Sequence, residues 1–285
     1  MKALFCTDGS KISYNALTNF INWFDNPTVD VLSVADLGVV PDNTSLEASE
    51  FAMYCTKSVD DILDYTEDIM AENKININRK NKMCGSVVDS ILEMEDNSNY
   101  DLIILGSNGK KGIQKWLGSV SQEIASLSKT SVYISKTNNK SKRVLFTVDS
   151  THESLNTVKK AIETLCLSDK EIYLATVYEM PEYVFLEGKL DNNWIDEIER
   201  QQQRASIALL KQIEKLFNEK GLEICSKSVL SGVPAAEIIS HAQRMDIDLT
   251  VTGMRQRKYL SRFILGSVSK RILENVKSDI FIVKL

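Results

Sequence analysis

The sequence has little of what metal sites and nucleophilic enzymes need. Its 285 residues include two histidines and five cysteines, and no two cysteines are spaced as Cys-x-x-Cys. Neither His152 nor His241 stands at a metal-ligand spacing from Cys, Asp or Glu, and no Ser-His-Asp order or nucleophile elbow is present. The odd number of cysteines argues against a complete set of disulfides. We therefore expect reduced thiols, with Cys6, Cys84 and Cys225 buried in or beside strands.

Long apolar runs and a basic net charge are also missing. No stretch approaches the roughly 18 uninterrupted apolar residues of a membrane-spanning helix. The short apolar run after Lys2 soon reaches Asp8, unlike a signal peptide. The formal net charge is −5, which disfavours general binding to nucleic acid or to anionic membranes. The sequence thus predicts a cytoplasmic protein whose partners are neither membranes nor nucleic acids.

What the sequence does have is an internal repeat. A composition of 43 % apolar and 26 % charged residues is that of an ordinary globular protein, and the length favours two domains. The same landmarks recur in the same order, separated by 149 − 8 = 141 residues at the first pair and 266 − 118 = 148 at the last. The matched pairs are Asp8 and Asp149, Gly85 and Gly232, Gly106 and Gly253, and Gly118 and Gly266. We predict two homologous domains, at 1–137 and 142–285, joined by a polar linker at 137–141.

Within each half, strand-like apolar segments alternate with amphipathic segments of helical spacing. The first half has helix patterns at 13–24 and 44–72, and the second has a long one at 192–220. This alternation predicts an α/β fold with doubly wound parallel sheets and helices on both faces. Such sheets bind ligands at the carboxyl ends of their strands, so we expect one pocket in each half.

The most informative stretch is a glycine loop that occurs in both halves. The first copy reads Gly106-Ser107-Asn108-Gly109, then Gly118-Ser119 after eight residues; the second reads Gly253-Met254-Arg255-Gln256, then Gly266-Ser267 after nine. Each copy follows a strand pattern and opens a helix pattern, where glycine backbone N–H groups and a helix N-terminus can hold a phosphate. Neither copy is a Walker A motif or a dinucleotide GxGxxG motif. From spacing alone, a phosphate site and a purely structural loop are equally good interpretations.

These motifs, together with LGSVSKRILENVKSDIFIVK at 265–284, resemble the universal stress protein family, and the resemblance covers both halves. It implies a tandem protein of two Rossmann-like domains, each with a five-stranded parallel sheet of strand order 3-2-1-4-5. It also implies pairing of domains through their fifth strands, so that segments 131–135 and 279–283 lie side by side in an intramolecular pseudo-dimer. A homodimer of whole chains is the other possible assembly.

The resemblance also implies candidate ligands and the residues that bind them. Some family members bind ATP or AMP, with Mg²⁺ as a possible companion, and others bind no nucleotide. In binding members an aspartate after strand one and the end of strand two hold the adenosine, and the glycine loop and Gly-Ser hold the phosphates. In the first half this implies Thr7, Asp8, Val34, Gly85, Gly106, Ser107, Gly109, Gly118, Ser119 and Val120. In the second half it implies Asp149, Val177, Gly232, Gly253, Arg255, Gly266, Ser267 and Val268.

We expect the first half to be the nucleotide site. Its loop has eight residues before Gly118 where the family has nine, but the second half carries Gln256 where the family has a glycine, as non-binding members do. A side chain there would crowd a phosphate. Both loops are basic, as anion binding favours. The simpler interpretation of Asp8 and Asp149 is that each caps the helix that follows it.

The leading functional hypothesis is a stress-response sensor or regulator that binds an adenine nucleotide. The second is an interaction module in which both loops are relics and function lies on surfaces for protein partners that the sequence does not identify. The third is a weak ATPase or self-phosphorylating protein, although no general base or metal-binding carboxylate cluster is visible. We therefore assign no catalytic residue and no metal ligand.

Overall fold

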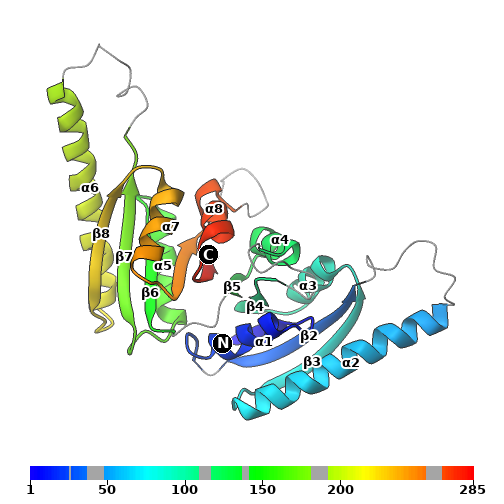
Figure 1. Ribbon diagram of the computed structural model, residues 1–285. Helices are drawn as coiled ribbons and strands as arrows, with labels where there is room; N and C mark the ends of the chain where they lie inside the picture. The colour runs from blue at the N-terminus through cyan, green and yellow to red at the C-terminus, as the bar shows by residue number, and fades with distance from the viewer. Residues whose placement is uncertain (26, 37–47, 109–116, 137–140, 181–191, 255–264) are drawn as a thin grey trace.

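The computed structural model describes residues 1–25, 27–36, 48–108, 117–136, 141–180, 192–254 and 265–285 (Figure 1). The first half contains β1 (Lys2–Cys6), α1 (Lys11–Phe20), β2 (Thr28–Asp36), α2 (Ala48–Glu72), β3 (Ile77–Gly85), α3 (Val87–Asp96), β4 (Leu102–Gly106), α4 (Ser119–Leu127) and β5 (Ser131–Ser135). The second half contains β6 (Arg143–Thr147), α5 (His152–Thr164), β7 (Glu171–Tyr178), α6 (Asn192–Asn218), β8 (Ile224–Ser231), α7 (Pro234–Arg244), β9 (Leu249–Gly253), α8 (Ser267–Asn275) and β10 (Asp279–Val283). Gly109, Arg255, Gln256, most of both glycine loops and residues 137–140 of the predicted linker lie outside the described residues, so the domain boundary stays a prediction.

The ten strands of the described residues form one sheet, in the order β3-β2-β1-β4-β5-β10-β9-β6-β7-β8. Within each half the pairs are parallel, and each half has the predicted strand order 3-2-1-4-5. The halves meet where β5 pairs antiparallel with β10. The predicted α/β class, the strand order and the contact between segments 131–135 and 279–283 are therefore confirmed.

Two hydrophobic cores cover the two faces of the sheet. Alternate side chains of each strand point to opposite faces, so Phe5 of β1 joins one core and Leu4 joins the other. Helices α1, α2, α5 and α6 pack on the first face, and α3, α4, α7 and α8 pack on the second. Since each core contains residues of both halves, the halves form one continuous body.

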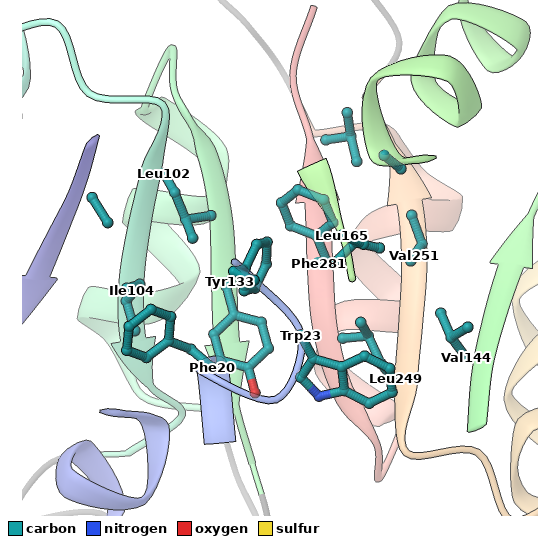
Figure 2. Close-up of a cluster of buried hydrophobic side chains, with 14 of the residues drawn as sticks. Phe20, Trp23, Leu102, Ile104, Tyr133, Val144, Leu165, Leu249, Val251 and Phe281 are labelled. Carbon is teal, nitrogen blue, oxygen red and sulfur yellow. The ribbon is translucent and has the colours of Figure 1, made fainter. Parts of the chain in front are cut away.

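An aromatic cluster joins the halves on the first face (Figure 2). Trp23 and Phe24, which follow α1, are fully buried there. The Phe24 ring lies 5.5 Å from the Tyr133 ring and 5.2 Å from the Phe281 ring, both edge-on. The Trp23 carbonyl also accepts a hydrogen bond from the Cys166 backbone N–H, at 2.8 Å. The end of α1 is thus attached to the second half.

The first helix departs from the expected range of 13–24. It runs from Lys11 to Phe20, because the Ser10 hydroxyl accepts a hydrogen bond from the Ser13 N–H and fixes the start earlier. The chain leaves the helix after Phe20 and turns so that Trp23 and Phe24 reach the second half. Helical spacing continued to Phe24 in the sequence, but tertiary packing ends the helix sooner.

The cysteine prediction is correct for one of three positions. Cys6 is buried as expected, whereas Cys84 and Cys225 are exposed. Cys84 lies in β3 and Cys225 in β8, which are the outermost strands of the sheet. Alternate residues of these edge strands stay in contact with solvent. The sequence pattern of a single strand does not show whether that strand lies at the edge or in the middle of the sheet. Among the described residues, no helix combines the length and apolar character that crossing a bilayer requires.

Candidate functional site

The residues predicted to bind a ligand come together at the carboxyl ends of the strands. In the second half, Asp149 follows β6, Val177 lies near the end of β7, Gly253 ends β9 and Ser267 begins α8. The first half repeats this order around Asp8. Parallel strands end at the same edge of a sheet, so residues that are distant in sequence become neighbours there.

A pocket of about 460 Å³ opens at this edge in the second half. Its volume lies within the range of roughly 300–1,000 Å³ that small-molecule sites occupy. Six of the eight residues predicted for this half line it, namely Asp149, Val177, Gly253, Gly266, Ser267 and Val268. Gly232 does not line it, and Arg255 lies outside the described residues.

Asp149 is held in a fixed turn beside the pocket. One of its carboxylate oxygens accepts hydrogen bonds from the backbone N–H (3.0 Å) and the hydroxyl of Thr151, and its own N–H donates to the Ser154 hydroxyl at 3.0 Å. The helix cap itself is Thr151, whose hydroxyl accepts from the Ser154 N–H. The interpretation of Asp149 as the cap is therefore wrong: the carboxylate supports the capping residue. The same holds for Asp8, which accepts from the N–H of the capping residue Ser10 at 3.0 Å.

The lining of the pocket is rich in hydroxyl groups and carries negative charge. Ten serine and threonine residues contribute: Thr147, Ser150, Thr151, Ser154, Thr157, Thr176, Ser206, Thr252, Ser267 and Ser269. Among the described lining residues every charged side chain is acidic, namely Asp149, Glu153 and Glu179. The basic residues predicted for the second loop lie outside the described part of the chain. The described walls thus offer hydrogen bonds to a ligand but no cation to a phosphate.

The start of α8 supplies backbone donors to one end of the pocket. Gly266 is its N-cap and provides no side-chain hydrogen bond to the first turn, so that turn depends on outside partners for its N–H groups. The Ser269 hydroxyl donates to the Gly253 carbonyl at 2.8 Å and ties α8 to the end of β9. Unpaired N–H groups and the helix dipole make such an end suited to an anion.

Sequence reasoning missed one wall of the pocket. Gln202, Ala205, Ser206 and Leu209 of α6 line it, as do Tyr178 and Glu179 at the end of β7. The α6 residues recur every three or four positions and so share one face of the helix. That spacing was visible in the sequence, but nothing in it indicated that this face lies over the strand ends.

The corresponding edge of the first half is also closely packed. The Gly118 N–H donates to the Ser107 carbonyl at 2.7 Å, so the N-cap of α4 already has a partner within the loop. A Cβ on Gly106 would lie 2.9 Å from the backbone nitrogen of Ser13. Tyr14 also lies here, with its ring edge-on to Tyr65 of α2 at 5.1 Å. Burial raises the pKa of the Tyr14 phenol, while hydrogen bonding with Thr66 and Thr7 acts in the opposite direction.

Gly85 and Gly232 have a conformational reason to be glycine. Each stands just before a helix, with φ of +140° and +134° respectively, a region that other residues rarely adopt. Their recurrence in both halves therefore follows from the backbone path between strand and helix. Among the described residues no group of three or more His, Cys, Asp or Glu side chains is placed to hold a metal ion.

Two alanine substitutions, at one glycine beside each loop, test this packing. Gly106→Ala is expected to lower the free energy of unfolding by about 1–3 kcal/mol, because backbone atoms of Ile12 and Ser13 at 2.9–3.0 Å would have to move. A Cβ added at Gly266 would meet nothing within 4 Å, and the φ of this residue is an ordinary −61°. Gly266→Ala should therefore lower the free energy of unfolding by less than about 1 kcal/mol. Urea denaturation of both variants measures the difference. Equal costs would contradict the close approach at Gly106.

Comparison with known proteins identifies the family to which the two halves are similar. A model of the universal stress protein family matches residues 1–136 and again residues 140–284. A universal stress protein of Methanocaldococcus jannaschii is 30 % identical over 143 residues, which are 50 % of this chain and 82 % of the relative. The stress response protein NhaX of Bacillus subtilis is 46 % identical over 52 residues, 18 % of this chain and 30 % of that protein. A solved universal stress protein from Archaeoglobus fulgidus has the same fold, with a TM-score of 0.73, 21 % identity and coverage of 99 % of this chain and 98 % of that chain.

Two family matches on one chain agree with the duplicated landmarks and with the repeated strand order. The chain therefore belongs to the universal stress protein family, with one copy of the family's domain in each half.

Proposed function

We propose that this protein binds an adenine nucleotide, ATP or AMP, and acts as a sensor or regulator in the stress response. The observation that carries the proposal is the second-half pocket, where Asp149, Val177, Gly253 and Ser267 line one cavity at the start of α8. In this proposal the Asp149 carboxylate and the backbone at Val177 bind the adenosine. Gly253 and the first turn of α8 bind the phosphates.

The geometry favours the second half over the first as the principal site. The preference for the first half rested on Gly109, where the second half has Gln256. Both residues lie outside the described part of the chain, so that preference stays a prediction. The support for the second half is its pocket, which six of the residues predicted for that half line. A Cβ added at Gly266 would meet nothing within 4 Å, whereas one added at Gly118 would lie 3.2 Å from the Ser107 carbonyl oxygen. With no metal-binding cluster among the described residues, a magnesium ion would be carried by the nucleotide phosphates, as is usual for this ion.

Isothermal titration calorimetry with ATP and with AMP tests the proposal. We expect Asp149→Ala to weaken binding roughly 10- to 100-fold, because a hydrogen bond to a charged group contributes about 1.5–3 kcal/mol. Asp8→Ala is the matched control, since it removes the equivalent carboxylate from the first half and should leave the affinity unchanged. Circular dichroism checks that both variants are folded.

The outcomes separate the two halves. Weakening only in Asp8→Ala would move the site to the first half. No heat from the unchanged chain at millimolar nucleotide would refute nucleotide binding altogether.

The second candidate function is an interaction module without nucleotide. It is favoured by the pocket's charge, because Asp149, Glu153 and Glu179 repel phosphates and the described lining offers no cation. Nucleotide released by acid denaturation of protein that was never exposed to added nucleotide would rule it out.

A further inference from the structure

The two halves meet around a pseudo-two-fold axis. Tyr133 of β5 is paired with Phe281 of β10, and these residues occupy corresponding positions, 281 − 133 = 148 residues apart. Phe24 and Leu165 form an isolated bridge and are likewise counterparts, 165 − 24 = 141 residues apart. Residues that face their own counterparts lie on the axis of an isologous contact.

One set of contacts across this interface is symmetric. The Lys136 ammonium, just after β5, donates to the Leu273 and Val276 carbonyls at 2.5 and 2.8 Å, at the end of α8 in the other half. Its counterpart Lys284, just after β10, donates to the Ser128 carbonyl at the end of α4. Because each half carries both the lysine and the helix end, any pairing of two halves could form these contacts.

A second set of contacts is not symmetric. The Asp279 carboxylate of β10 is fully buried. It accepts hydrogen bonds from the Tyr133 hydroxyl at 2.6 Å, the Ser135 hydroxyl at 3.2 Å and the Lys136 backbone N–H at 2.7 Å. All three donors come from the first half. The amide of Asn19 donates to the Ser135 hydroxyl at 2.9 Å and so orients it.

The second half lacks the side chains that satisfy this carboxylate. The counterparts of Tyr133 and Ser135 are Phe281 and Val283, which have no polar side-chain atom. Two second halves paired with each other would therefore bury two aspartates. Of the three donors, each aspartate would keep only the backbone N–H, which Lys284 supplies in place of Lys136. Burying a carboxylate without its partners is strongly unfavourable. In the first half the position of Asp279 is taken by Ser131, so two first halves would bury two tyrosine hydroxyls and no carboxylate.

We propose that the Asp279 cluster, consisting of Asp279, Tyr133, Ser135 and the Lys136 N–H, selects the partner at this interface. It favours a first half against a second half and excludes pairs of like halves. The symmetric lysine contacts and the aromatic packing stabilise any pair, whereas the Asp279 cluster discriminates between pairs. The chain contains equal numbers of first and second halves, so each pair of first halves leaves two second halves to pair with each other. Because a pair of second halves is unfavourable, pairs of first halves are suppressed as well.

The full chain can be tested after it is cut between the halves. A protease site introduced between residues 137 and 140 allows cleavage of the folded protein. The nicked protein is unfolded in guanidinium chloride, refolded by dialysis, and analysed by native mass spectrometry, which distinguishes the three kinds of pair because the halves differ in mass. We expect like pairs below about 1 % of all pairs, since each mispaired carboxylate loses two hydrogen bonds worth roughly tenfold or more each.

A symmetric variant should lose the selection. With Asp279→Ser and Tyr133→Phe together, like pairs should rise toward the random value of about one half of all pairs. The control is Asp30→Asn, because Asp30 is also a buried carboxylate that accepts from a tyrosine, Tyr100 at 2.8 Å, but lies in β2 away from the interface. It should keep the ratio of the unchanged chain.

Two results would overturn the proposal. The first is random pairing in the unchanged nicked chain. The second is exclusive pairing of unlike halves in the refolded double variant. If the double variant does not refold, Tyr133→Phe alone decides, and a fraction of like pairs that does not rise above that of the unchanged chain counts against the Asp279 cluster.

Discussion

The variant Phe24→Ala is expected to lose about 4 kcal/mol of unfolding free energy. Deleting a buried phenylalanine side chain costs about 3–5 kcal/mol through lost burial and the cavity left behind. Phe24 is 1 % exposed and contacts two further aromatic rings, Tyr133 and Phe281, each edge-on. Each such ring pair adds about 0.5–1.5 kcal/mol. Denaturation in guanidinium chloride, followed by circular dichroism, measures the loss.

Phe24→Leu is the matched control for this prediction. Leucine stands at the corresponding position of the second half, where Leu165 is 6 % exposed and faces Phe24. A change that keeps most of the apolar volume usually costs less than about 1.5 kcal/mol. A loss below about 1 kcal/mol in Phe24→Ala would mean that the aromatic cluster does not join the halves as described.

The second large effect concerns pH. The free energy of unfolding is expected to rise by about 2 kcal/mol between pH 7 and 8.5, because Lys284 is buried and Lys136 is partly buried at the interface. Burial lowers the pKa of Lys284 to about 7, with Glu95 acting weakly in the opposite direction. Burial likewise lowers the pKa of Lys136 to about 8, against the charges of Asp279 and Glu274. Both side chains donate to helix-end carbonyls of the other half.

The direction of the effect follows from proton counting. An unfolded lysine has a pKa of about 10.4, so between pH 7 and 10 the unfolded chain binds more protons than the folded one, and raising the pH favours the fold. The range begins at pH 7 because His241, whose pKa burial lowers, contributes a similar rise below that pH. It ends at 8.5 because burial raises the pKa of Cys6 far above that of an unfolded cysteine, so this thiol increasingly offsets the rise at higher pH.

Chemical denaturation at pH 7.0, 7.75 and 8.5 checks this prediction. In the double variant Lys136→Met, Lys284→Met the rise should disappear. Lys129→Met is the control, because Lys129 is a solvent-exposed lysine paired with Asp96 near the same helix end. A slope that persists without the two buried lysines would contradict their role.

The architecture could be predicted because the same landmark residues occur in both halves of the sequence. Asp8 and Asp149 at strand ends and the two Gly-Ser helix starts established the duplication, and the strand–helix alternation established the fold class. The strand order and the β5–β10 contact came from the family resemblance rather than from the residue pattern, and the structure confirms both.

The features that distinguish the halves could not be predicted, because they depend on distances between elements. The open pocket requires α6 to present Ala205 and Ser206 toward the strand ends. At the same edge of the first half, the hydrogen bond from Gly118 to Ser107 and the Tyr14 ring contact are likewise set by the distances between elements. The role of Asp279 was also invisible, since its three donors lie in β5 or just after it, 143 to 146 residues earlier.

The pseudo-two-fold axis has a consequence for how such a chain can change over generations. In a homodimer of single domains, one codon specifies both sides of the axis, so any new residue meets itself. Here Tyr133 and Phe281 face each other from separate codons, as do Phe24 and Leu165. When both domains lie in one chain, each side of the contact can be substituted independently. Complementary pairs, such as a tyrosine facing an aspartate, can then arise. One domain can then specialise in a ligand while the other keeps the assembly together.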